Sequence, residues 1–106
     1  MGKSISFEFE DRTYTLEYNR AAIQAMEKRG FVANEMGDKP ATMVPLLFEG
    51  AFTMHHRFEK AERIRQIYDQ LTNKAELIGK LAEMYNEPLE AMMDNAEGNV
   101  AWSASW

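Results

Sequence analysis

Cysteine is absent from this sequence, and histidine occurs only as the adjacent pair His55 and His56. The first absence excludes disulfide scaffolds, thiolate zinc sites and cysteine nucleophiles. Adjacent residues on a helix point about 100° apart, so the two histidines cannot hold one ion between them. No catalytic serine or carboxylate pair stands near them, and no glycine-rich phosphate loop occurs. We therefore expect no enzyme activity, no metal site and no cofactor, and we interpret the histidines as the polar end of a helix.

Long hydrophobic runs are also missing. No apolar stretch approaches the roughly 20 residues that a membrane-spanning helix needs, and residues 1–8 lack the basic-then-apolar layout of a signal peptide. The chain has 106 residues, of which 45% are hydrophobic and 27% are charged. This size and composition are typical of one soluble globular domain, and we expect no membrane partner.

Basic residues are missing from the C-terminal quarter, because no Lys or Arg follows Lys80. Residues 1–80 carry 12 basic and 12 acidic residues, so the net charge of −5 arises entirely after that point. Nucleic-acid binding needs several uncompensated Lys or Arg residues, and we expect no nucleic-acid partner. One local basic patch exists: Arg57, Lys60, Arg63 and Arg65, interleaved with Glu59 and Glu62. We interpret it as a solvated helix face; the alternative is docking against the acidic end of a second copy.

Residues 5–18 alternate between apolar and polar side chains with a period of two. Such alternation is typical of strands that bury one face, and here it predicts a β-hairpin. The turn is expected at residues 10–13, where Asp11 tolerates a left-handed conformation. The apolar face comprises Ile5, Phe7, Phe9, Tyr14, Leu16 and Tyr18.

The remainder of the chain predicts helices. Asn19 is suited to cap a short helix that Gly30 ends. Residues 42–56 are the most apolar segment and predict the central helix, with Thr42 as its cap and Pro45 in its first turn. Gly50 inside this helix indicates a close-packed neighbour.

Two further helical segments follow. Residues 59–71 have apolar residues at helical spacing, and Asn73 with Glu76 forms a capping-box pattern that opens the next helix. Pro88 is expected to break or kink that helix near Asn86, and residues 98–99 to end the last helical piece. We therefore predict an α+β, mostly α fold with an N-terminal β-hairpin packed on a bundle of four or five short helices. Residues 1–98 would form one globular domain and residues 99–106 a short Trp-containing C-terminal tail.

The sequence contains eight methionines, and methionine suits both irregular cores and adaptable binding surfaces. The two tryptophans of the tail either fold back on the core or anchor a partner. The same two interpretations, core or partner contact, apply to the apolar residues of segment 42–56. Our candidate partner-binding residues are Met43, Leu47, Phe48, Phe52, Met54, Trp102 and Trp106.

Three segments carry a resemblance to a known family: residues 7–20, residues 43–56 ending in His-His, and residues 71–78 with Met84 and Tyr85. Their order is hairpin, short helix, apolar helix, further helices and a Trp-containing tail. This order resembles a family of small proteins of siphophages and prophages of Gram-positive bacteria, the tail assembly chaperones. The resemblance covers nearly the whole chain, and its motifs are structural rather than catalytic.

The resemblance implies a chaperone that binds the phage tape-measure protein non-covalently during tail morphogenesis and is displaced as the tail-tube protein polymerises. Such proteins act in the host bacterial cytoplasm, are absent from the mature virion, and are often made as a short and a frameshifted longer form. A homo-oligomer is a further expectation. The alternatives are another phage morphogenesis component (a minor tail or head–tail completion protein) and a small inhibitor of a host defence protein.

Overall fold

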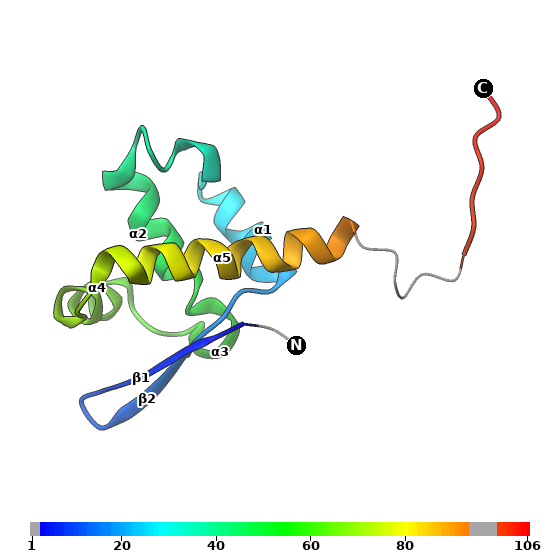
Figure 1. Ribbon diagram of the computed structural model, residues 1–106. Helices are drawn as coiled ribbons and strands as arrows, with labels where there is room; N and C mark the ends of the chain where they lie inside the picture. Colours follow the sequence, from blue (N-terminus) through cyan, green and yellow to red (C-terminus); the bar gives the residue numbers. More distant parts are fainter. Residues whose placement is uncertain (1–2, 94–99) are drawn as a thin grey trace.

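The computed structural model describes residues 3–93 and 100–106. Within these residues the chain forms one antiparallel hairpin followed by five α-helices and a short 3₁₀-helix, which confirms the predicted α+β, mostly α class. Figure 1 shows the hairpin projecting from the helices, with α5 crossing the middle of the molecule. The elements are β1 (Ile5–Phe9), β2 (Arg12–Leu16), α1 (Arg20–Lys28), η1 (Ala33–Glu35), α2 (Pro40–Gly50), α3 (Thr53–His56), α4 (Ala61–Gln70) and α5 (Lys74–Met93).

The hairpin closes through a two-residue loop. Glu10 and Asp11 have φ angles of 50° and 67°, and two consecutive positive φ angles are typical of a type I′ turn, whose twist matches that of the flanking strands. Phe9 therefore pairs with Arg12, and Phe7 with Tyr14. The predicted alternation is confirmed. The loop is shorter than the expected turn over residues 10–13, because Arg12 and Thr13 already pair as part of β2.

Helix α1 has both predicted ends. The Asn19 side chain accepts a hydrogen bond of 2.8 Å from the Ala22 amide, which satisfies one of the free donors of the first turn. Gly30 follows the last turn with a φ of 100°, a conformation that costs glycine little. After this turn Phe31 is buried in the core.

The apolar segment 42–56 forms two helices rather than the single predicted one. Helix α2 begins at Pro40 instead of Thr42, because proline at the first helical position loses no hydrogen bond. The break follows Gly50, where the Ala51 and Phe52 amides bond the carbonyls three residues earlier, both at 3.1 Å. The Ala51 carbonyl accepts instead from the Glu17 amide, at 3.0 Å. A tertiary hydrogen bond thus replaces a helical one at this point.

Helix α5 continues through Pro88, so a break near Asn86 is wrong, and the alternative of a kink there stays a prediction. A proline removes one amide donor, and its neighbours in the ladder remain paired. Leu81 and Tyr85 are buried in the core before the proline, and half-buried Leu89 packs against the core after it. The helix segments on both sides of Pro88 are therefore attached to the core. The helix end predicted at residues 98–99 and the domain boundary after residue 98 lie outside the described residues.

The start of α5 also differs from the prediction. Asn73 has a φ of 55°, whereas a capping residue has extended backbone. Its side-chain amide donates to the Glu76 carboxylate. The two residues of the predicted capping box therefore meet through their side chains.

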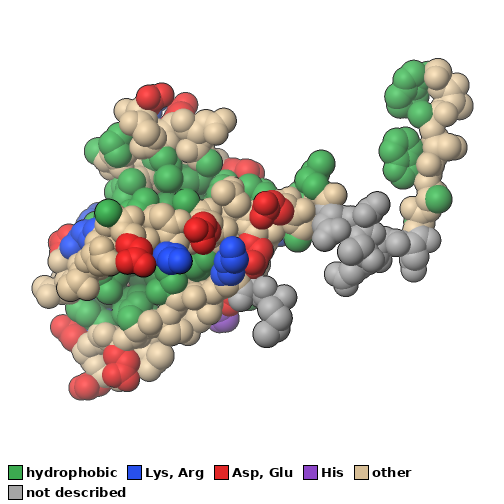
Figure 2. Space-filling model, viewed as in Figure 1, with side chains coloured by type: hydrophobic (Ala, Val, Ile, Leu, Met, Phe, Trp, Pro, Cys, Tyr) green, Lys and Arg blue, Asp and Glu red, His purple; other side chains and the backbone are tan. Residues whose placement is uncertain are grey.

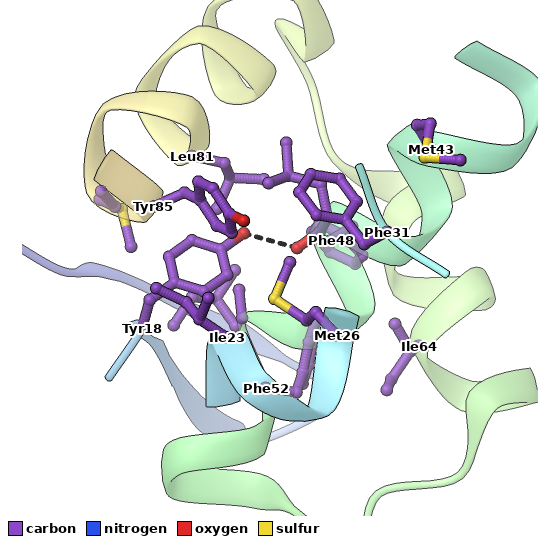
Figure 3. Close-up of a cluster of buried hydrophobic side chains, with 14 of the residues drawn as sticks. Tyr18, Ile23, Met26, Phe31, Met43, Phe48, Phe52, Ile64, Leu81 and Tyr85 are labelled. Carbon is purple, nitrogen blue, oxygen red and sulfur yellow. Dashed lines mark hydrogen bonds between the residues drawn. The ribbon is translucent and has the colours of Figure 1, made fainter. Parts of the chain in front are cut away.

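The core is organised around α2, which packs against α1, α4, α5 and η1. Figure 3 shows buried side chains of the helices meeting Tyr18, which follows β2, in the core beside α2. The Tyr18 hydroxyl donates a hydrogen bond to the Leu47 carbonyl. Gly50 lies against α1: a Cβ at this position would sit 2.3 Å from the Met26 Sδ. The predicted close-packed neighbour of Gly50 is therefore confirmed.

Candidate functional site

Four of the seven candidate partner-binding residues are core residues. Met43, Leu47, Phe48 and Phe52 are between 1% and 4% exposed. Three of them belong to α2, which α1, α4, α5 and η1 contact, and Phe52 follows that helix. The expectation of a partner contact is wrong for Met43, Leu47 and Phe52, which a partner could reach only if the core opened. Phe48 is equally buried, but its side chain lines a surface groove.

The other three candidates lie at the surface. Met54 is 40% exposed, and Trp102 and Trp106 are 83% and 103% exposed. Residues 100–106 form neither helix nor strand, and Figure 2 shows the large apolar side chains of this segment standing clear of the helices. The interpretation in which the tryptophans fold back onto the core is therefore wrong.

An apolar groove runs between α2 and α4. It has a cavity volume of about 470 Å³, and its lining includes Val44, Pro45, Phe48, Ile64 and Tyr68. Phe48 and Ile64 are buried and underlie the groove, whereas Pro45 is exposed. A groove of this volume with apolar walls suits side chains of a partner.

The walls of the groove were not predicted from the sequence. Val44 and Tyr68 belong to segments predicted to be helical, and they are half-buried. Their signal is periodicity: Val44 and Phe48 are four residues apart, as are Ile64 and Tyr68, so each pair lies on one helix face. Which faces oppose each other depends on how α2 and α4 pack, and the sequence does not contain that information directly.

The rim of the groove is mainly acidic. Glu49, Glu62 and Asp69 line it together with one basic residue, Arg65. Glu49 is already engaged by Arg29, with an N–O distance of 2.9 Å. The arrangement favours an amphipathic partner that carries Lys or Arg beside its apolar face.

A polar junction ties the hairpin to α3 and the following loop. The Thr15 amide donates to His56 Nε2 at 3.0 Å, and the Tyr14 hydroxyl donates to Glu59 at 2.8 Å. His55 Nε2 lies 2.9 Å from a Glu17 carboxylate oxygen. The two histidines therefore connect α3 to the hairpin side of the domain. His56 accepts a hydrogen bond from the β2 backbone, and His55 lies against Glu17 just after β2.

His56 is held in its neutral form. Its Nε2 accepts the Thr15 amide, which requires the ring proton on Nδ1. Partial burial lowers the pKa of His56, and the positive charges of His55 and Arg12 lower it further, against a smaller opposing effect of Glu59. Both histidines lie in the last turn of α3, so the prediction that they form the polar end of a helix is confirmed, with His56 uncharged in this position.

The described part of the chain contains no group of three or more His, Asp or Glu side chains placed to hold a metal ion. Over the same residues, no helix combines the length and apolarity that crossing a bilayer requires. The described residues form a small α+β domain with an apolar, acid-rimmed groove and further exposed apolar side chains. Such surfaces are typical of proteins that bind other proteins.

Comparison with known families assigns this domain. The chain matches the family described as "Domain of unknown function (DUF5055)" over residues 1–106, and it belongs to that family. No curated protein matches the chain. No solved structure matches it either.

Proposed function

We propose that this protein is a phage tail assembly chaperone that binds the tape-measure protein non-covalently in the host cytoplasm during tail morphogenesis. The tape-measure protein would be held through its amphipathic helices and released as the tail-tube protein polymerises. The observation that carries the proposal is the groove between α2 and α4, and the sequence resemblance supplies the partner.

The groove suits this task because of its shape and charge. Its apolar volume of about 470 Å³ accommodates apolar side chains that repeat every three or four residues on a partner helix. Lys and Arg residues flanking that apolar face would meet Glu62 and Asp69 on the rim. Shielding of this kind needs no chemistry, only reversible burial of apolar surface.

The charge of the whole chain supports the same role. A protein that exposes apolar surface is prone to associate unspecifically, and a net charge far from zero opposes this. The net charge is −5, and the acidic excess lies after Lys80. Figure 2 shows charged side chains in a row along α5, with apolar side chains on either side of the row.

The test is co-expression of the chain with the tape-measure protein encoded in the same tail gene cluster. We expect the soluble fraction of the tape-measure protein to rise severalfold with the wild-type chain. Val44→Lys should abolish this gain, because a lysine in the groove repels a basic-flanked helix and hydrates the apolar wall. Val32→Lys is the matched control, since Val32 is 44% exposed and does not line the groove.

The experiment tests two claims separately: that the protein is a chaperone, and that the groove is its binding site. An unchanged soluble fraction with the wild-type chain contradicts the chaperone function. A gain that survives Val44→Lys contradicts the groove as the binding site. Recovery of the protein from purified virions would favour a minor tail or head–tail completion protein, and tight one-to-one binding of a host protein would favour a defence inhibitor.

A further inference from the structure

A second apolar surface lies on the loop that joins α3 to α4. Phe58 is 86% exposed there, and Met54 on α3 is 40% exposed. Both line a hollow of about 540 Å³. Neither the core nor the α2–α4 groove involves these two side chains, so both remain available to a partner.

The surroundings of Phe58 are basic. The Arg57 guanidinium lies 4.9 Å from the centre of the Phe58 ring, which positions both groups for contact with a partner. Arg12 also lines the hollow, and its charge is partly balanced by Glu59 at 3.5 Å. Lys60 follows directly and is exposed. We call Arg12, Met54, Arg57, Phe58 and Lys60 the basic corner.

The C-terminal half of α5 has the opposite character. Glu83, Glu87 and Glu90 occur at intervals of four and three residues and therefore lie along one face of the helix. The exposed methionine Met93, 87% accessible, continues this face. No Lys or Arg follows Lys80 in the sequence, and the Glu87 carboxylate accepts a hydrogen bond of 2.9 Å from the Lys3 amide. We call Glu83, Glu87, Glu90 and Met93 the acidic stripe.

We propose that the basic corner of one copy binds the acidic stripe of a second copy, so that the protein self-associates through charge-complementary, apolar-centred surfaces. The exposed Phe58 ring would contact the Met93 side chain, and Arg57 and Lys60 would face the glutamates. The basic corner and the acidic stripe are different surfaces. If two copies make both contacts reciprocally, they form a closed dimer; if they make only one contact, the pair keeps one free corner and one free stripe that can bind further copies. This inference goes beyond the proposed chaperone function and does not depend on it.

The experiment uses the purified full chain alone, with sedimentation equilibrium at low ionic strength. We expect the average mass to rise above the 12.2 kDa of one chain as the concentration increases. The association should weaken in 1 M salt, where the Debye length is about 3 Å. Arg57→Glu and Glu90→Arg should each weaken it about tenfold or more, since each places like charges opposite one another.

The decisive variant combines both changes. Arg57→Glu with Glu90→Arg in one chain restores opposite charges across the contact, so we expect self-association to return toward the wild-type level. Lys28→Glu is the matched control for the charge change, because Lys28 is exposed on α1 outside both surfaces, and it should associate like the wild type. Phe58→Ser tests the apolar centre and should weaken association without altering the circular dichroism spectrum.

Three results would overturn the proposal. One is a wild-type chain that stays at 12.2 kDa over the whole concentration range. Another is a double charge swap that remains as weakly associated as the single variants. The third is association that Phe58→Ser leaves intact. Val44→Lys, which tests the groove, should leave self-association unchanged, so the failure of either proposal can be recognised separately.

Discussion

At the scale of single residues, the close approach of α1 and α2 depends on the absence of a side chain at Gly50. A Cβ there would lie 2.3 Å from Sδ and 2.5 Å from Cγ of Met26. The packed atoms include the middle of the methionine side chain as well as its flexible end. A second helical glycine, Gly79 in α5, has no heavy atom within 4 Å of such a Cβ. Gly79 therefore serves as the uncrowded control position for a substitution at Gly50.

We predict that Gly50→Ala destabilises the protein and Gly79→Ala stabilises it. Alanine is the better helix former by about 1 kcal/mol at both positions, but overpacking at Gly50 costs about 1–3 kcal/mol. Urea unfolding followed by circular dichroism measures both effects. Equal shifts of the two midpoints in the same direction would contradict the packing of α1 on α2.

The Tyr18 hydroxyl is a second residue-scale feature. Burial raises the pKa of Tyr18 strongly, and the nearby Tyr85 adds to the effect, so the hydroxyl remains protonated and donates to the Leu47 carbonyl. This bond satisfies a carbonyl in the last turn of α2, where helical partners are missing.

Tyr18→Phe is predicted to lower the free energy of unfolding by about 1–3 kcal/mol, because it leaves a buried carbonyl without a partner. Tyr68→Phe, at a half-buried tyrosine on the groove wall, should change it by less than about 0.5 kcal/mol. Denaturant unfolding of both variants provides the comparison. A Tyr18→Phe variant as stable as the Tyr68→Phe variant would show that the bond contributes nothing.

At the scale of elements, the hairpin is attached to α3 by side chains as well as by apolar packing. His56 accepts from the strand backbone at Thr15, and the hairpin's apolar face packs on the core. Two strands alone are marginally stable in water. The attachment therefore decides whether the hairpin stays in place.

Stability is predicted to fall with pH below about 6.5, the ordinary pKa of histidine. The pKa of His56 is lowered in the folded chain, so the unfolded chain takes up the proton first as the pH falls. The contribution of neutral His56 to the free energy of unfolding is fully present above the pKa of histidine in the unfolded chain. It is lost as the pH falls through the lower pKa of His56 in the folded chain. Protonation also turns the Nε2 acceptor into a donor that faces the Thr15 amide.

Urea midpoints measured between pH 7.5 and pH 5 test this dependence. In His56→Gln the side-chain oxygen can still accept from Thr15, and the loss of stability over this range should become smaller. His55→Gln is the neighbouring control and should retain most of the loss, because burial is the main cause of the His56 shift. A pH dependence unaltered by His56→Gln would assign it to other groups.

At the scale of the whole molecule, the surfaces available after folding include the α2–α4 groove, the basic corner and the acidic stripe. Of the buried cluster, Met43, Leu47 and Phe52 belong to none of these surfaces, whereas Phe48 lies beneath the groove. The groove and the corner differ in character, since the groove has a mainly acidic rim and the corner carries Arg12 and Arg57. One chain could therefore bind a basic-flanked helix and a second copy of itself at the same time.

The sequence by itself determined the features that depend on neighbouring residues. The strand alternation, the Asn19 cap and the Gly30 helix end involve side chains within a few positions of one another, and all three are confirmed. The close neighbour of Gly50 was also predicted, because an interior glycine costs helix stability that close packing can offset. The identity of that neighbour, Met26, was not.

Only the tertiary structure decided where the apolar segment breaks, which of its faces are buried and where a partner could bind. The break after Gly50 depends on the Glu17 amide, more than thirty positions away, and on its bond to the Ala51 carbonyl. The groove requires Val44 and Tyr68 to lie on facing helices. Such contacts join residues distant in sequence, and their positions follow from the packing of all the helices together, which local patterns do not specify.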